Sequence, residues 1–170
     1  MLKTSSGSML IKNITINSRQ TQKLGEKLAK EILELPLQKS AVILGLQGNL
    51  GGGKTTFLQG FAKGLGIKEK ILSPTYAIMK KFKIPKIPLH TKCPTAHFIY
   101  NERFCNFYHF DCYRLNGGKD VLELDFKKIV TDSKNIVAIE WPEKIKSVLP
   151  KNTIKIRFKV VGENKRNITT

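Results

Sequence analysis

Short apolar runs alternate along this chain with longer stretches whose apolar residues recur every three or four positions. The short runs predict strands at residues 9–16, 41–46, 76–82, 106–111, 136–140 and 153–161. The longer stretches predict helices at residues 17–35, 54–65 and 120–130. Strands that alternate with helices are typical of a three-layer α/β fold with a central, mostly parallel sheet.

Residue types at the ends of the predicted helices agree with this division. Asn17 is a good N-cap for the first helix, and Pro36 would end it. Asp120 and Glu123 have the spacing of a capping box at the start of the third helix.

Two segments fall outside the alternating pattern. Residues 83–105 hold three prolines among basic and apolar residues, which predicts a long surface hairpin or loop inserted into the domain. Residues 162–170 are mostly polar and predict a tail. The chain has enough apolar residues for one hydrophobic core, so we expect a single domain over residues 1–170.

Residues 48–56 match the pattern of a phosphate-binding loop between a predicted strand and a predicted helix, which is the context the motif requires. In such a loop, successive backbone N–H groups surround phosphate oxygens. Lys54 would reach the β- and γ-phosphates, and the Thr55 hydroxyl would bind Mg²⁺. The predicted nucleotide-binding residues of the loop are Gly48, Asn49, Leu50, Gly51, Gly52, Gly53, Lys54, Thr55 and Thr56.

Two predicted strands end in a carboxylate, namely Asp111 and Glu140. Ligands of open α/β sheets bind at the carboxyl ends of the strands, where the phosphate-binding loop also begins. Carboxylates bind Mg²⁺ and can orient or deprotonate an attacking water. The sequence therefore predicts catalytic or metal-binding roles for both acids, and the division of roles between them stays open.

Two more residues adjoin these motifs. Thr75 follows a Ser-Pro turn and is a candidate for contacting Mg²⁺ or the γ-phosphate from a switch-like segment, with an ordinary turn threonine as the alternative. Trp141 directly follows Glu140 and is the only tryptophan. It would lie either beside the site or in the core.

The chain carries 30 lysine and arginine residues against 13 acidic residues, a formal net charge of +17. Such a surface attracts polyanions such as nucleic acid, although a solvated lysine-rich surface has the same composition. Residues 83–105 interleave cations with aromatic residues, which would suit contact with tRNA or a partner, or packing of the aromatic residues against the domain. The histidines and cysteines of this segment lack a recognised zinc spacing.

No apolar run is long enough to span a membrane. The three cysteines do not make an even disulfide framework. Both observations favour a cytoplasmic protein without a membrane partner.

In their order along the chain, the motifs resemble the TsaE family, small bacterial ATPases required for threonylcarbamoyladenosine at position 37 of certain tRNAs. The resemblance covers about residues 14–168 and rests on residues 48–56, 65–67, 73–76, 109–115, 139–143 and 149–150. It implies a Mg²⁺-dependent ATPase that acts on a TsaD/TsaB-type complex and meets tRNA directly or through that complex. The motifs offer no obvious arginine finger to neutralise the transition state, so we expect slow ATP turnover by the chain alone and a partner that completes the site.

The resemblance also implies roles for individual residues. The implied catalytic residues are Lys54, Thr75, Asp111 and Glu140, and the implied metal ligands are Thr55, Asp111 and Glu140. Further matches place Arg166 near the nucleotide, Asn17 and Arg19 beside the base, and Trp141 at the site or at a partner surface.

The chain departs from the family pattern at three positions. Asn49 stands where relatives usually have Asp, Gly52 where Ala is frequent, and Asp125 where Gly is common. Two other functions stay open, a small-molecule phosphotransferase and a non-catalytic, nucleotide-gated RNA-binding module. A phosphotransferase would usually need an arginine-bearing lid, whereas a pure binding module would not need both acids.

Overall fold

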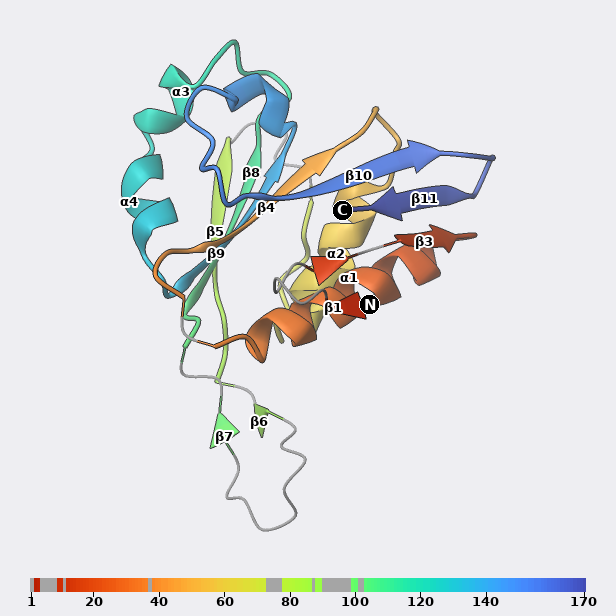
Figure 1. Ribbon diagram of the computed structural model, residues 1–170, viewed down its shortest axis with the longest axis horizontal. Helices are drawn as coiled ribbons and strands as arrows, with labels where there is room; N and C mark the ends of the chain where they lie inside the picture. Colours follow the sequence, from red (N-terminus) through yellow and green to blue (C-terminus); the bar gives the residue numbers. More distant parts are fainter. Residues whose placement is uncertain are drawn as a thin grey trace.

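The computed structural model describes residues 2–3, 9–10, 12–36, 38–72, 78–86, 88–89, 99–100 and 103–170. Its centre is a seven-stranded sheet in the order β3-β11-β10-β4-β9-β8-β5 (Figure 1). The strands are β3 (Lys12–Thr15), β4 (Val42–Gln47), β5 (Met79–Lys83), β8 (Asn106–Asp111), β9 (Asn135–Glu140), β10 (Ile154–Val160) and β11 (Arg166–Thr169). The neighbours β10, β4, β9 and β8 are parallel, whereas β11 and β5 run antiparallel to the strands beside them. Two short antiparallel pairs lie outside this sheet, β1 (Leu2–Lys3) with β2 (Met9–Leu10) and β6 (Pro88–Leu89) with β7 (Ile99–Tyr100).

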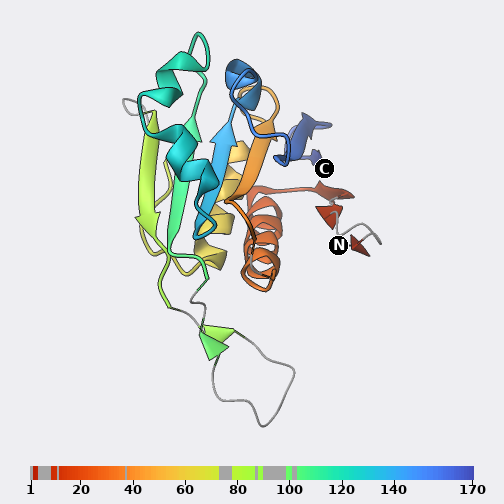
Figure 2. The same ribbon diagram turned by 60° about the vertical axis from the view of Figure 1, so that its left-hand side comes forward.

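Helices cover both faces of the central sheet (Figure 2). One face carries α1 (Ser18–Leu33) and α2 (Lys54–Gly64), and the other carries α3 (Lys119–Leu122), α4 (Phe126–Thr131) and the 3-10 helix η1 (Pro142–Ile145). The predicted three-layer α/β fold with a mostly parallel sheet is therefore confirmed. In the described part of the chain, no helix combines the length and apolar character needed to cross a bilayer.

Successive side chains of β4 enter two different cores. Leu44 and Leu46 pack with α1 and α2, whereas Ile43 packs with α3 and α4. Side chains of a strand alternate between the two faces of its sheet. Because both faces are covered here, every position of the central strands favours an apolar residue, which explains the continuous apolar runs of the sequence.

The two helices beside the phosphate-binding loop pack backbone against backbone. A Cβ atom at Gly25 would lie 2.2 Å from the Phe57 carbonyl oxygen, and one at Gly60 would lie 1.9 Å from the Gln22 carbonyl oxygen. Glycine at these positions lets α1 approach α2 more closely than any side chain would allow. The start of α1 is thereby held next to the start of α2, where the loop lies.

The helix predicted at residues 17–35 is confirmed as α1. Its N-cap is Asn17, whose Oδ1 accepts a hydrogen bond of 2.9 Å from the backbone N–H of Gln20. The helix predicted at residues 54–65 is confirmed as α2. In place of the single strand predicted at residues 9–16, residues 9–10 form β2 and residues 12–15 form β3. These two strands belong to different sheets, since β2 pairs with β1 and β3 pairs with β11 in the main sheet.

The single helix predicted at residues 120–130 is wrong, since two short helices, α3 and α4, occupy this stretch. Asp125 separates them in the left-handed conformation, with φ of 56°. The predicted capping box is also wrong, because α3 begins after Gly118 without a side-chain cap. Glycine adopts this left-handed conformation without steric cost, which explains why the family pattern commonly has glycine at the position of Asp125.

The prediction of a polar tail from residue 162 is wrong as well. Residues 166–169 form β11, which lies between β10 and β3 in the central sheet. Ile168 is fully buried there and belongs to the core beneath α1 and α2. The other three residues of β11 are only partly buried, so one apolar residue suffices for this strand.

The segment at residues 83–105 leaves the sheet and returns to it at the same point. Ile84 donates its backbone N–H to the Cys105 carbonyl oxygen at 2.9 Å, and both Ile84 and Phe104 are buried in the core. The β6–β7 pair projects from the end of the sheet where β8 begins (Figure 1). This end lies opposite the phosphate-binding loop, because the loop follows the carboxyl end of the parallel strand β4. Of the four side chains considered for a metal in this segment, His90, Cys93 and His97 lie outside the described residues, and Cys105 is an exposed free cysteine.

Candidate nucleotide-binding site

The predicted phosphate-binding loop connects the end of β4 to the first turn of α2. Gly48, Gly51 and Gly53 adopt positive φ angles of 146°, 71° and 94°. At Gly48 a Cβ atom would also lie 2.5 Å from the Phe158 carbonyl oxygen, so only glycine fits there. These conformations let the chain turn sharply from strand to helix, and the N-terminus of α2 points its free N–H groups at the loop.

Lys54 lies inside the loop that precedes it. Its Nζ donates hydrogen bonds to the carbonyl oxygens of Gly48 at 2.7 Å and Asn49 at 3.1 Å. The same nitrogen lies 4.1 Å from the centroid of the Trp141 ring, a cation–π contact. Burial of the ammonium lowers the pKa of Lys54, and nearby carboxylates, Glu140 foremost, oppose this shift. The result is a positive charge held where a phosphate in the loop would meet it.

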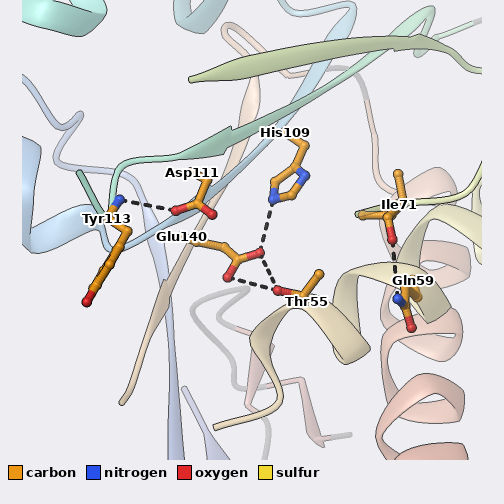
Figure 3. A network of polar contacts seen from close by, with 7 residues as sticks. All are labelled: Thr55, Gln59, Ile71, His109, Asp111, Tyr113 and Glu140. Atoms are coloured by element: carbon orange, nitrogen blue, oxygen red, sulfur yellow. Dashed lines mark hydrogen bonds and ion pairs between the residues drawn. The ribbon is translucent and has the colours of Figure 1, made fainter. Parts of the chain in front are cut away.

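A chain of hydrogen-bonded polar side chains connects the loop helix to two neighbouring strands (Figure 3). The Thr55 hydroxyl on α2 donates to Glu140 at the end of β9, with distances of 3.0 Å to Oε1 and 3.2 Å to Oε2. His109 on β8 places its Nε2 at 3.1 Å from the same Oε1. Glu140 and His109 are 3% and 1% exposed, so the bond between them is shielded from water, whereas Thr55 is only partly buried.

The second predicted acid, Asp111, stands directly beside Glu140 on the adjacent strand. Its Oδ1 accepts a 3.1 Å hydrogen bond from the backbone N–H of Tyr113 (Figure 3). Asp111 is half-buried, whereas Glu140 is buried and bonded to Thr55. The structure thus brings both acids to the same edge of the sheet but gives them different environments.

These residues surround a pocket of about 340 Å³. Its lining comprises Asn17, Ser18, Thr21, Leu50, Gly51, Gly52, Gly53, Lys54, Thr55, Thr56, Asp111, Tyr113, Glu140, Trp141, Asn164 and Arg166. The start of α1 forms one wall, and the turn between β10 and β11 forms another through Arg166. The Arg166 guanidinium donates to the Gly51 carbonyl oxygen at 3.2 Å, which ties this turn to the loop.

Comparison with known proteins shows the family of this chain. The family model described as "Threonylcarbamoyl adenosine biosynthesis protein TsaE" matches residues 15–168. The chain belongs to the TsaE family. Three relatives carry the name tRNA threonylcarbamoyladenosine biosynthesis protein TsaE. The Bacillus subtilis protein is 31% identical over 91% of this chain and 81% of its own length. The Treponema pallidum protein is 33% identical over 78% of this chain and 83% of its own length, and the Rickettsia prowazekii protein is 32% identical over 89% of both chains. The crystal structure of Bacillus subtilis YdiB is similar in fold, with a TM-score of 0.63 and 28% identity over 95% of this chain and 84% of that one.

Most of the predicted site residues line this pocket, with four exceptions. Gly48 and Asn49 belong to the loop but do not line the pocket. Arg19 is exposed on the first turn of α1 and does not line the pocket, whereas its neighbours Ser18 and Thr21 do. Thr75 lies outside the described residues, so its switch-like role stays a prediction. Trp141 is partly buried, lines the pocket and also packs against the core under α3 and α4.

Five residues of this TsaE-family site were not singled out from the sequence, namely Ser18, Thr21, His109, Tyr113 and Asn164. His109 contacts Glu140, the Tyr113 ring lies 5.0 Å from the Trp141 ring, and Asn164 lines the pocket. The alternation of β8 could have indicated His109, because it places a polar residue on the covered face of the sheet two positions after the buried Phe107. No local pattern marks Tyr113 or Asn164, whose positions depend on loops.

The oxygen donors of the site suit Mg²⁺ that arrives with a nucleotide. Thr55 offers a hydroxyl, and Asp111 and Glu140 offer carboxylates beside the loop. The described residues hold no group of three or more histidine, cysteine or acidic side chains that could bind a metal ion unaided. Mg²⁺ usually takes one or two carboxylates and completes its shell with water and phosphate oxygens, so this donor set fits.

Proposed function

We propose that this TsaE-family protein binds ATP with Mg²⁺ in the pocket over residues 48–56 and hydrolyses it in support of t6A37 formation in tRNA. The observation that carries the proposal is the hydrogen bond from Thr55 to Glu140, next to Lys54, within one pocket of about 340 Å³. A loop that only shaped a turn would need neither the buried carboxylate nor the buried ammonium, each of which is costly to bury. The names of the relatives supply the biological process.

Each side chain of the pocket has a role in this proposal. The loop N–H groups and the positive end of α2 bind the phosphates, and Lys54 stabilises charge on the β- and γ-phosphates. Thr55 and Asp111 would hold Mg²⁺, which when bound would supply positive charge beside the phosphates. Glu140 binds Mg²⁺ or orients the attacking water. Asn17 and Arg166 form the walls that would flank the rest of the nucleotide.

The site lacks an arginine that could stabilise the transition state. Among the pocket-lining residues the arginine is Arg166, and its guanidinium is bonded to four backbone carbonyl oxygens. An arginine supplied in trans raises phosphoryl transfer by roughly 10³–10⁵ in related chemistry. We therefore propose slow hydrolysis by the chain alone and stimulation by TsaD- and TsaB-like partners.

Phosphate release from ATP, with and without those partners, tests the proposal together with binding of a fluorescent ATP analogue. Glu140→Gln keeps the shape of the side chain but removes its charge, so we expect retained binding and strongly reduced turnover. Glu123→Gln makes the same change at an exposed residue outside the pocket and should match the wild type.

Three outcomes would contradict the proposal in different ways. Binding without any phosphate release, even with partners, would favour a nucleotide-gated binding module. Transfer of the phosphate to a small acceptor would favour a phosphotransferase. Wild-type turnover in Glu140→Gln would remove Glu140 from the catalytic step.

A further inference from the structure

His109 is a buried histidine that the proposed phosphate and metal contacts leave without a role. It lies on β8 two positions before Asp111, and its side chain is 1% exposed. Its Nε2 lies 3.1 Å from Glu140 Oε1, whereas its Nδ1 is buried and has no hydrogen-bond partner among the described residues.

The partner of Nε2 determines which ring nitrogen carries the proton. An ionised carboxylate only accepts hydrogen bonds, so Nε2 must donate to Glu140. In the neutral ring Nδ1 is then a bare acceptor, and it faces no donor. An apolar side chain of similar shape would fill the same space without an unpaired polar atom. What the imidazole adds at this position is therefore its Nε2–H bond to Glu140.

That bond distinguishes the two oxygens of Glu140. The Thr55 hydroxyl is nearly equidistant from them, at 3.0 Å and 3.2 Å, so it does not select one orientation of the carboxylate. His109 contacts Oε1 and thereby leaves Oε2 as the less engaged oxygen of a residue that lines the pocket (Figure 3).

The sheet supports this arrangement through its register. His109 pairs with Ala138 across β8 and β9, and Glu140 follows Ala138 by two positions on the same face. Phe107 and Ala138 belong to the core under α2, so His109 and Glu140 both point to the side on which Thr55 lies. The distance between imidazole and carboxylate is thus set by two hydrogen-bonded strands rather than by a loop.

We infer that His109 is a positioning residue, which orients the Glu140 carboxylate for ATP hydrolysis through the Nε2–H bond to Oε1. This inference rests on the proposed function, because it assigns His109 to the same site. Since His109 does not line the pocket, its loss should change the catalytic step and not nucleotide binding.

Two amide substitutions provide a matched test. The side-chain nitrogen of glutamine is as many bonds from Cβ as Nε2 of histidine, so His109→Gln can donate to Glu140. The side-chain nitrogen of asparagine is one bond closer to Cβ, at the position of Nδ1, so it does not reach Glu140. We expect His109→Asn to lower kcat of the partner-stimulated reaction by about 10- to 100-fold, the usual effect of losing such an orienting partner. His109→Gln should restore most of kcat, and KM and ATP-analogue affinity should stay within about threefold in both variants.

Combining His109→Asn with Glu140→Gln distinguishes a loss of kcat through Glu140 from a loss of kcat through misfolding. In the Glu140→Gln background His109→Asn should cause no further loss of kcat, because the oriented carboxylate is already gone. Thermal unfolding of each variant shows whether the protein assayed is folded. Equal kcat for His109→Asn and His109→Gln, or full additivity of His109→Asn with Glu140→Gln, would overturn the inference.

Nitrogen-15 NMR of the histidine rings tests the bond independently of turnover. The His109 signals, identified by their absence from His109→Asn, should show a protonated Nε2 and a bare Nδ1. A protonated Nδ1 with a bare Nε2 would overturn the inference even if the chain hydrolyses no ATP. A wild type that lacks turnover but shows the expected tautomer would instead contradict only the proposed function, with Glu140 still oriented by His109.

Discussion

Replacing Gly60 with alanine tests how the two helices beside the phosphate-binding loop are held together. The new Cβ would lie 1.9 Å from the Gln22 carbonyl oxygen, whereas ordinary contacts begin at 3.4 Å. The helices would therefore have to separate locally by about 1.5 Å. No change of rotamer relieves this overlap, because the Cβ position and the carbonyl are both set by helical backbone.

The expected loss of stability follows from two opposing effects. Alanine is favoured over glycine inside a helix by about 1 kcal/mol. Overpacking typically costs about 1–3 kcal/mol, and a clash with backbone belongs at the upper end of that range. The free energy of unfolding should therefore fall by about 2 kcal/mol, which lowers Tm by about 4–8 °C for a chain of this length.

Thermal unfolding monitored by circular dichroism measures this shift, with Gly117→Ala as the control. A Cβ atom at Gly117 would have no heavy atom within 4 Å, so its Tm should change little. Because the start of α1 lines the pocket, Gly60→Ala should also weaken binding of an ATP analogue. An unchanged Tm for Gly60→Ala would refute the close backbone contact between α1 and α2.

Lys54→Ala should weaken binding of an ATP analogue by about 10- to 100-fold or more, since a hydrogen-bonded charge facing the phosphates is lost, whereas the exposed Lys63→Ala should not. Fluorescence titration measures both, and equal affinities would place Lys54 outside the phosphate site. Asp125→Gly should raise the free energy of unfolding by about 0.5–1 kcal/mol in urea titrations, because glycine adopts the left-handed conformation without steric cost; a decrease would contradict the strain assigned to this residue. Deleting residues 87–102 keeps the buried Ile84 and Phe104. If this segment contacts tRNA, the deletion should weaken tRNA association and flatten its salt dependence while ATP affinity stays the same. Unchanged tRNA affinity and salt slope would leave the segment without an RNA role.

Features that depend on neighbouring residues were predictable from the sequence. The strand at residues 106–111, the N-cap at Asn17 and the glycine-rich loop all follow from side-chain alternation, capping chemistry and backbone freedom within a few positions. The meeting of Asp111 and Glu140 was also predictable, because parallel strands bring their carboxyl ends to one edge.

Features that depend on distant partners were decided only by the tertiary structure. Residues 166–169 form a strand because β10 and β3 offer backbone hydrogen bonds on both sides, and their own polar composition gives no such signal. Likewise the sequence shows His109 only as one polar residue in a strand, and its contact with Glu140 depends on the pairing of β8 with β9. The different environments of Asp111 and Glu140 arise in the same way. The burial of Glu140 and its contact with Thr55 depend on how α2 packs over the sheet. Local patterns specify the elements, whereas register and packing over long sequence separations specify which side chains meet.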